Sequence, residues 1–258
     1  SIPYADPSSQ ATIPTVYIDH GRGTNSIKAG TFTLDGESIE TLVWAPLKMR
    51  TTRRLMMRTY EQRQGEDDNE IACMSYDGTH AHGRGGRSES EPAKGRKCAT
   101  CPSGEWVNNQ VPICTPNIEL FMMVQIERED GKHWTPAFMF IRGQNVKHIR
   151  EAYRIAEGAA SRHGVPICFF AMQSTLEAKG KMGTQVLKNA GPRKVDEEDV
   201  AAIRTWAARD SSGESPALTI FKKRIESDHL LAETIGNLDP QKINVEVRDE
   251  AGSPKIPF

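Results

Sequence analysis

The chain has 258 residues, of which 37% are hydrophobic and 26% are charged, and its formal net charge is −1 at pH 7. A chain of this length can bury a core without a metal or a disulfide, and a net charge near zero does not by itself indicate an anionic partner. No window approaches the roughly 20 apolar residues of a membrane helix, and the first residues lack the basic and apolar regions of a signal peptide, so we predict a cytoplasmic protein.

The first part of the chain predicts a small β-structure behind a flexible arm. Residues 1–12 are rich in Ser, Pro and Asp and predict the arm. From Ile13 to Leu55, short alternating apolar runs separated by Gly or Asp-Gly turns predict an antiparallel sheet or barrel. Residues 60–70 are polar and predict a loop.

The next segment, Cys73 to Cys114, has almost no hydrophobic periodicity and is rich in glycine. A stretch of this kind cannot hold itself together by burial, so it is either disordered or ordered by something else. It also carries four of the five cysteines of the chain.

Regular elements then return. The segments "IELFMMVQIERE" and "HWTPAFMFIRG", joined by Asp130-Gly131, predict a β-hairpin. Helical spacing in "NVKHIREAYRIAEGAASRHG" and acids at the start of "DEEDVAAIRTWAARD" predict two helices. The segments "VPICFFAMQSTLEAK" and "PALTIFKKRIES" predict strands. The resulting domain prediction is an α+β body over residues 13–235, which contains a 73–114 insert and is followed by a 236–258 tail.

The cysteines of the insert predict a zinc site. Cys98 and Cys101 form a C-x2-C pair, whose thiolates can reach one metal ion from a tight turn, and Cys114 supplies a third ligand. Cys73 is the preferred fourth ligand because thiolate sulfur suits a closed structural site; His80 and His82 are the alternatives. An odd number of cysteines in a chain without an export signal disfavours a disulfide framework.

The cysteines could also have one of three roles that do not involve a structural zinc site. They could be unrelated free thiols, or a redox C-x2-C pair, although such a pair is typical of a strand-to-helix turn. A catalytic zinc would need a general base, and Glu105 and Asp77 are available without any characteristic pairing motif. No nucleophile, phosphate-loop or dinucleotide motif accompanies them, so we predict that the protein is not an enzyme.

Basic and aromatic residues inside and just before the insert predict a nucleic-acid-binding surface. Cations pair with phosphates, and aromatic rings stack on unpaired bases. The alternatives are a solvated face for the cations and core packing for the aromatic rings. The predicted contact residues are Lys48, Arg50, Arg53, Arg54, Arg58, Tyr60, Arg84, Arg87, Arg96, Lys97 and Trp106.

The order of these motifs resembles a family of phage-type proteins with "C-x-S-x-DG", "C-x2-CP-x-x-x-W" and "P-x-C-x-x-N" segments. Here they fall at Cys73–Gly78, Cys98–Trp106 and Pro112–Asn117. A more distant similarity is to the zinc-bearing helix-destabilising protein of T-even phages, in which a zinc subdomain decorates an oligonucleotide-binding (OB) barrel. That family uses one histidine with three cysteines, unlike the four cysteines here.

The last three residues, Ile256, Pro257 and Phe258, resemble the tip of bacterial single-stranded DNA-binding proteins, which docks on replication and repair partners. The chain departs from that pattern at Lys255, where an Asp is expected, and its tail carries few acids. The resemblance implies a partner-binding tip.

Together these resemblances imply an OB-like barrel with a zinc-ordered insert and peripheral helices. The implied function is single-stranded DNA binding in phage-type replication and recombination, without strong sequence preference, in the host cytoplasm. The implied partners are single-stranded DNA and replication or recombination proteins, with no membrane, and the implied cofactor is Zn²⁺. The alternative is a zinc-ribbon transcription or polymerase-associated factor whose insert contacts a protein.

Overall fold

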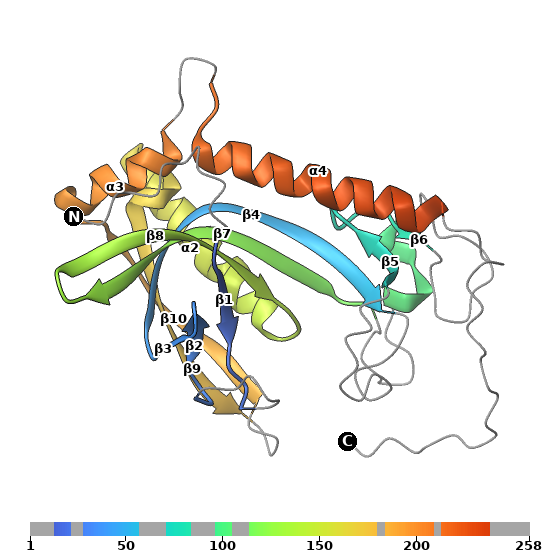
Figure 1. Cartoon of the computed structure of the whole chain (residues 1–258), viewed down its shortest axis with the longest axis horizontal. Helices are drawn as coiled ribbons and strands as arrows, with labels where there is room; N and C mark the ends of the chain where they lie inside the picture. Colours follow the sequence, from blue (N-terminus) through green and yellow to red (C-terminus); the bar gives the residue numbers. More distant parts are fainter. Residues whose placement is uncertain are drawn as a thin grey trace.

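A computed structural model describes residues 13–21, 28–56, 71–83, 96–104, 114–179, 184–208 and 213–237 (Figure 1). The described strands form one ten-stranded sheet. They are β1 (Thr15–Ile18), β2 (Phe32–Leu34), β3 (Glu37–Ile39), β4 (Leu42–Met56), β5 (Ile71–Ser75), β6 (His82–Gly83), β7 (Pro116–Arg128), β8 (Gly131–Ile141), β9 (Phe170–Lys179) and β10 (Thr184–Lys194).

The sheet is mixed and curls into a half-barrel. Its order is β10-β9-β4-β7-β8-β1-β2-β3, with β5 pairing β4 and β6 pairing β5. The β1–β8 pair is parallel, whereas the other pairs are antiparallel. The predicted β-rich α+β class is confirmed, as is the hairpin at Asp130-Gly131, where β7 and β8 pair from Ile118↔Ile141 to Arg128↔Gly131.

Strand β4 connects the main sheet to the part of the molecule that carries the cysteines. Its first residues, Leu42 to Trp44, pair with β9, and its last residues, Arg53 to Met56, pair with β5. Strand β7 runs antiparallel beside it from Pro116 to Gln125. In Figure 1 the two long strands leave the curled body together and end next to β5 and β6.

Strand β7 is buried on both faces over most of its length, which accounts for its uninterrupted apolar run from Leu120 to Val124. Leu120 and Met122 pack in one hydrophobic core with α2 (Asn145–His163). Phe121 and Met123 point the other way, into a second core formed with α3 (Glu197–Ala207) and α4 (Pro216–Asn237). Because successive side chains of a strand alternate between faces, a strand between two layers needs apolar residues at nearly every position.

The helices predicted at "NVKHIREAYRIAEGAASRHG" and "DEEDVAAIRTWAARD" are confirmed as α2 and α3. Helix α2 ends at Gly164, whose φ of 63° is left-handed, and its amide donates to Ala160 and Ser161 carbonyl oxygens. The glycine therefore ends the helix in the left-handed conformation that favours glycine at this position.

The strand predicted at "PALTIFKKRIES" is wrong, because this segment begins helix α4. Pro216 occupies the first helical position, where its missing N–H costs nothing, and the Ser215 hydroxyl accepts a hydrogen bond from the Leu218 amide at 3.2 Å. Ala217, Phe221 and Asp228 are buried on one side of the helix. Figure 1 shows α4 lying along β4 towards β5 and β6, and it contacts all three strands.

Within the described ranges, no helix is both long and apolar enough to cross a membrane. The predicted arm at residues 1–12 and the tail beyond Asn237, including the Ile256–Phe258 tip, lie outside the described residues.

Candidate functional site

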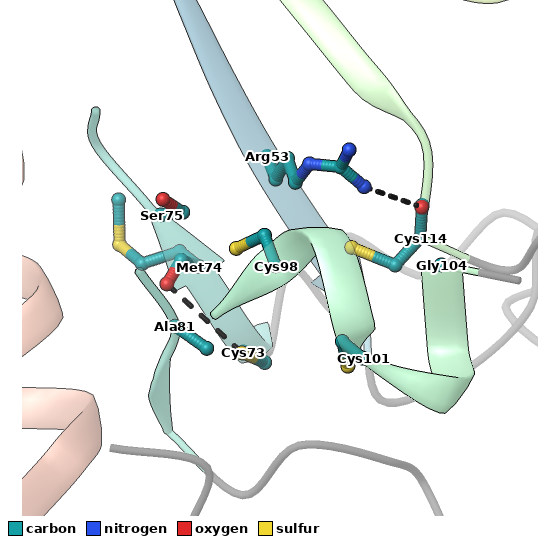
Figure 2. Close-up of a pocket in the computed structure, with 9 residues that line it drawn as sticks. All are labelled: Arg53, Cys73, Met74, Ser75, Ala81, Cys98, Cys101, Gly104 and Cys114. Carbon is teal, nitrogen blue, oxygen red and sulfur yellow. Dashed lines mark hydrogen bonds between the residues drawn. The ribbon is translucent and has the colours of Figure 1, made fainter. Parts of the chain in front are cut away.

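The four cysteines of the insert line one small cavity at the end of β4 (Figure 2). They are Cys73, Cys98, Cys101 and Cys114, and all four are buried. The cavity has a volume of about 10 Å³, which is room for one small ion or water. None of the five cysteines forms a disulfide. The fold therefore brings together the four residues that the sequence predicted as zinc ligands.

A hydrogen-bonded turn after β5 places Cys73 next to Cys98. The Asp77 carboxylate accepts hydrogen bonds from the Ser75 hydroxyl at 2.9 Å and from the Thr79 and His80 amides at 2.7 and 3.0 Å. The chain then turns back, and the Cys98 amide donates to the Thr79 carbonyl oxygen at 2.7 Å. The "SYDG" stretch of the first motif is therefore the turn that folds the insert onto itself.

Gly78 is required in this turn for two reasons. Its φ is 74°, which L side chains rarely adopt, and a Cβ there would lie 2.9 Å from Thr51 Cγ2 and 3.1 Å from the Thr51 carbonyl oxygen. The turn therefore packs directly against β4, and only glycine provides both the backbone conformation and the space.

Two short 3₁₀ helices, Cys98–Thr100 and Pro102–Gly104, position the C-x2-C pair: Cys98 begins the first, and Cys101 lies between the two. The Gly104 amide donates to the Cys101 carbonyl oxygen at 2.8 Å, and the Cys114 amide donates to the Ser103 carbonyl oxygen at 2.9 Å. The C-x2-C pair thus occupies a tight turn, as its spacing predicts, and Cys114 is attached to the end of that turn.

The chemistry of the donor set fits zinc, because four buried thiols without a disulfide are a typical closed ligand set. The thiols do not converge on one point, however: in the described part of the chain, no group of three or more Cys, His, Asp or Glu side chains is arranged to hold a metal ion. Cys73 Sγ instead lies 4.0 Å from the Met74 carbonyl oxygen, as Figure 2 shows. Metal binding therefore requires these side chains to rotate into the cavity.

Electrostatics at the cavity depend on Arg53. Burial raises the pKa of the Cys98 and Cys114 thiols, and the neighbouring thiols add to this rise. The guanidinium of Arg53 opposes it, because a nearby positive charge favours the thiolate. A metal cation in the cavity would act in the same direction as Arg53 and more strongly.

Neither alternative ligand lines this cavity. His80 is half exposed, and its Nδ1 lies 2.9 Å from the Thr79 hydroxyl and 3.5 Å from the Asp77 carboxylate. The His82 ring packs against Tyr76, with 5.2 Å between ring centroids. The arrangement therefore supports Cys73 over either histidine as the fourth member of the cluster.

Two of the predicted nucleic-acid contacts are part of an internal ion network. Arg50 is 9% exposed and pairs with Glu119 on β7 and with Asp228 on α4. Arg54 pairs with the same Asp228 at 3.1 Å. The charges of Arg50 and Arg54 are therefore neutralised within the fold by carboxylates of β7 and α4.

The remaining predicted contacts divide into three groups. Arg53 faces the cysteine cavity, and Arg96 and Lys97 adjoin it, since the Arg96 carbonyl accepts from the Ala81 amide at 2.8 Å. Lys48 is half-buried opposite Phe121 on β7. The others lie outside the described residues: Arg58, Tyr60, Arg84, Arg87 and Trp106.

A second, larger cavity lies beside the first and carries two cations that are not among the predicted contacts. Its volume is about 650 Å³, and Arg53, Lys147 and Arg150 line it. Lys147 and Arg150 stand three residues apart on α2 and are both exposed. That spacing places them on one helix face, which was the available signal in the sequence.

The fold and the site define a β-rich α+β protein with a four-cysteine cluster at the end of a long strand pair. Comparisons with protein-family models, with curated proteins and with solved structures find no match.

Proposed function

We propose that the protein binds single-stranded DNA in phage-type replication and recombination, through an OB-like curled sheet, and that its four cysteines hold a structural Zn²⁺. One observation carries the proposal. The cysteine cavity joins two segments of predicted DNA contacts that are distant in sequence, the end of β4 with Arg53 and the segment at Arg96 and Lys97.

Zinc would have a structural role in this proposal. Four thiolates fill a tetrahedral coordination sphere and leave no open position for a substrate or a reactive water. Cys98 and Cys101 would bind from the tight turn, and Cys73 and Cys114 would attach the two ends of the insert. The metal would then fix the basic insert against the end of β4.

Binding would depend mainly on phosphate neutralisation. Each phosphate that a Lys or Arg neutralises releases condensed counterions, so affinity falls as salt rises. Lys97 is exposed next to Cys98 and is the described residue of this segment best placed to contribute. Arg84, Arg87 and Trp106, which flank the cysteines in sequence, would add further charge and one stacking surface.

The proposal includes a second binding function at the C-terminus. Ile256, Pro257 and Phe258 would dock on a replication or recombination protein, as the resemblance to bacterial single-stranded DNA-binding proteins implies. Deleting these three residues should abolish that docking and leave DNA affinity unchanged.

The test of the proposal is direct. The affinity of the purified, metal-loaded protein is measured for oligo-dT, for duplex of the same length and for RNA, at several salt concentrations. We expect the tightest binding to oligo-dT and a slope of log K against log salt of about −0.7 per phosphate contacted.

The variant Lys97→Glu should weaken binding and reduce this slope, whereas Lys132→Glu, at the exposed β7–β8 hairpin, should change neither. Equal affinity for duplex, or no salt dependence, would refute the proposal, and stable capture of a polymerase with no DNA affinity would favour the zinc-ribbon alternative.

A further inference from the structure

We infer that the larger cavity is a phosphate-binding site and that it holds the sugar–phosphate backbone of the bound single strand. The identity of the strand rests on the proposed function, but the phosphate chemistry of the cavity does not. Among the predicted contacts that the structure describes, only Arg53 lines this cavity, so it is a second contact region beside the cysteine-bearing insert.

The cavity is built from three segments that are far apart in sequence. Arg53 comes from β4, the stretch Cys114 to Pro116 leads into β7, and the stretch Gly143 to Lys147 opens α2. Its volume of about 650 Å³ lies within the range of small-ligand pockets, roughly 300–1,000 Å³. The space is therefore large enough for a nucleotide unit, and more than an isolated inorganic anion needs.

The charge of the lining selects an anion. Arg53, Lys147 and Arg150 contribute three cations, and no described carboxylate lines the cavity. In the part of the chain that the structure describes, none of the three forms a salt bridge. Three unneutralised cations around one concavity create a positive potential that an anionic ligand relieves.

Each arginine is oriented by a neutral group, which leaves its charge available. Arg150 Nη2 donates to the Thr51 hydroxyl at 3.1 Å, and Arg53 Nη1 donates to the Cys114 carbonyl oxygen at 3.3 Å. Arg53 Nε is buried and has no hydrogen-bond partner among the described residues. A planar guanidinium held in this way is well suited to phosphate, which it can bind through two N–H groups.

The start of α2 adds to the same preference. Gln144, Val146 and Lys147 line the cavity at the first turn of the helix, where the helix dipole favours negative charge. This contribution is secondary to the three side chains, which supply full charges.

Arg53 also connects the phosphate cavity with the cysteine cluster, since it lines both and donates to the Cys114 carbonyl. Arg53 is therefore shared by the two cavities, and the variants that test this inference leave it unchanged.

The experiment compares the wild-type protein with the double variant Lys147→Glu/Arg150→Glu. Both side chains are exposed, so the substitutions should leave the fold intact, which thermal unfolding checks. The matched control is Arg162→Glu, an exposed arginine in the last turn of the same helix. Affinity is measured for oligo-dT by fluorescence anisotropy across a salt series, and for thymidine monophosphate and inorganic phosphate by calorimetry.

We expect the double variant to bind oligo-dT at least about tenfold more weakly, with a salt slope smaller by about 1.4 because two phosphate contacts are lost, and the control to match the wild type. Unchanged affinity and slope in a folded double variant would overturn the inference and leave the proposed function standing. If the wild type bound thymidine monophosphate or phosphate but no strand, and the variant lost that binding, the site would stand and the proposed function would fail. If the wild-type protein bound none of the three ligands, both this inference and the proposed function would be overturned.

Discussion

Arg50 on β4 lies directly opposite Glu119 on β7, and the two side chains form an ion pair that is almost completely buried, at 9% and 1% exposure. Helix α4 completes the network, because Asp228 also pairs with Arg50 and Arg224 donates to Glu119 at 2.8 Å. Glu119 is the one charged residue in the apolar run of β7, and its burial is compensated by two arginines. The network attaches α4 to the strands that lead to the cysteine cluster.

Glu119→Gln should destabilise the protein strongly. The substitution keeps the shape of the side chain but leaves Arg50 without one of its two acidic partners at a buried site. Breaking a buried pair by removing one partner typically costs about 3–5 kcal/mol. We expect a loss near the lower end of that range, because Asp228 remains beside Arg50. Urea unfolding followed by circular dichroism measures it.

The matched control is Glu40→Gln, which removes a carboxylate from an exposed pair with Lys28. Exposed pairs contribute about 0–1 kcal/mol, so this variant should unfold almost as the wild type does. If Glu119→Gln and Glu40→Gln lowered the free energy of unfolding by the same small amount, the buried network would not be what holds α4 in place.

Gly78→Ala should disturb the turn between β5 and the cysteine cluster. The added methyl meets both the side chain and the backbone of Thr51, and the left-handed backbone is strained for alanine. Strain of this kind costs about 1–3 kcal/mol before the clash is counted. Gly36→Ala is the control, because its φ of 84° brings the same strain but nothing lies within 4 Å of the new methyl. Urea unfolding measures the free energy of unfolding of both variants. If Gly78→Ala lost less of it than Gly36→Ala, the close packing of Gly78 against Thr51 would be contradicted.

Each of the four clustered cysteines should be needed for metal binding. Changing Cys73, Cys98, Cys101 or Cys114 to Ser should abolish tight binding of one Zn²⁺ per chain, measured by elemental analysis and by competition with a chromogenic chelator. Cys168→Ser is the control, because that thiol is buried in the second core, where burial raises its pKa to about 11. Full zinc content in any of the first four variants would remove that residue from the ligand set, and a metal-free wild type with an intact fold would remove the site.

The sequence correctly predicted elements whose conformation depends on residues that are close together in the chain. The Asp-Gly hairpin and helix α2, with its terminal Gly164, depend on residues that are neighbours in sequence. Helix α4 was missed because "PALTIF" is a short, mostly apolar run with two β-branched residues, which its pattern alone does not distinguish from a buried strand. The helix is instead defined by Ser215 and by burial at Ala217 and Phe221.

The cysteine cluster could be predicted from the composition of the insert alone. Four cysteines in a segment without a hydrophobic pattern indicated a cluster, and the fold places them around one cavity. Arg50 was predicted as a surface cation because its partner Asp228 is 178 positions away. Lys147 and Arg150 were missed for the same reason, since their cavity forms only when α2 meets the end of β4.

The stability that Asp77 contributes should disappear in acid. Burial alone would raise the pKa of the Asp77 carboxyl, but hydrogen bonds from Thr79, His80 and Ser75 outweigh burial and hold that pKa well below its ordinary value of 3.8. A carboxylate whose pKa is lower in the folded state stabilises the fold above the unfolded pKa, about 3.9, and loses this contribution as the pH falls towards the folded pKa.

Asp77→Ala should therefore lower the free energy of unfolding by about 1 kcal/mol at pH 7, the size of a capping interaction at a partly exposed site. The difference from the wild type should shrink steadily below about pH 4, because the protonated wild type loses the same contribution. Asp77→Asn is the control, since it keeps the acceptor oxygen without the charge; its smaller deficit at pH 7 should shrink in the same acidic range. Urea unfolding of the metal-free wild type and of both variants at pH 7, 4 and 2.5 measures these free energies. If the deficit of Asp77→Ala stayed constant down to pH 2.5, the charge of Asp77 would not stabilise the turn.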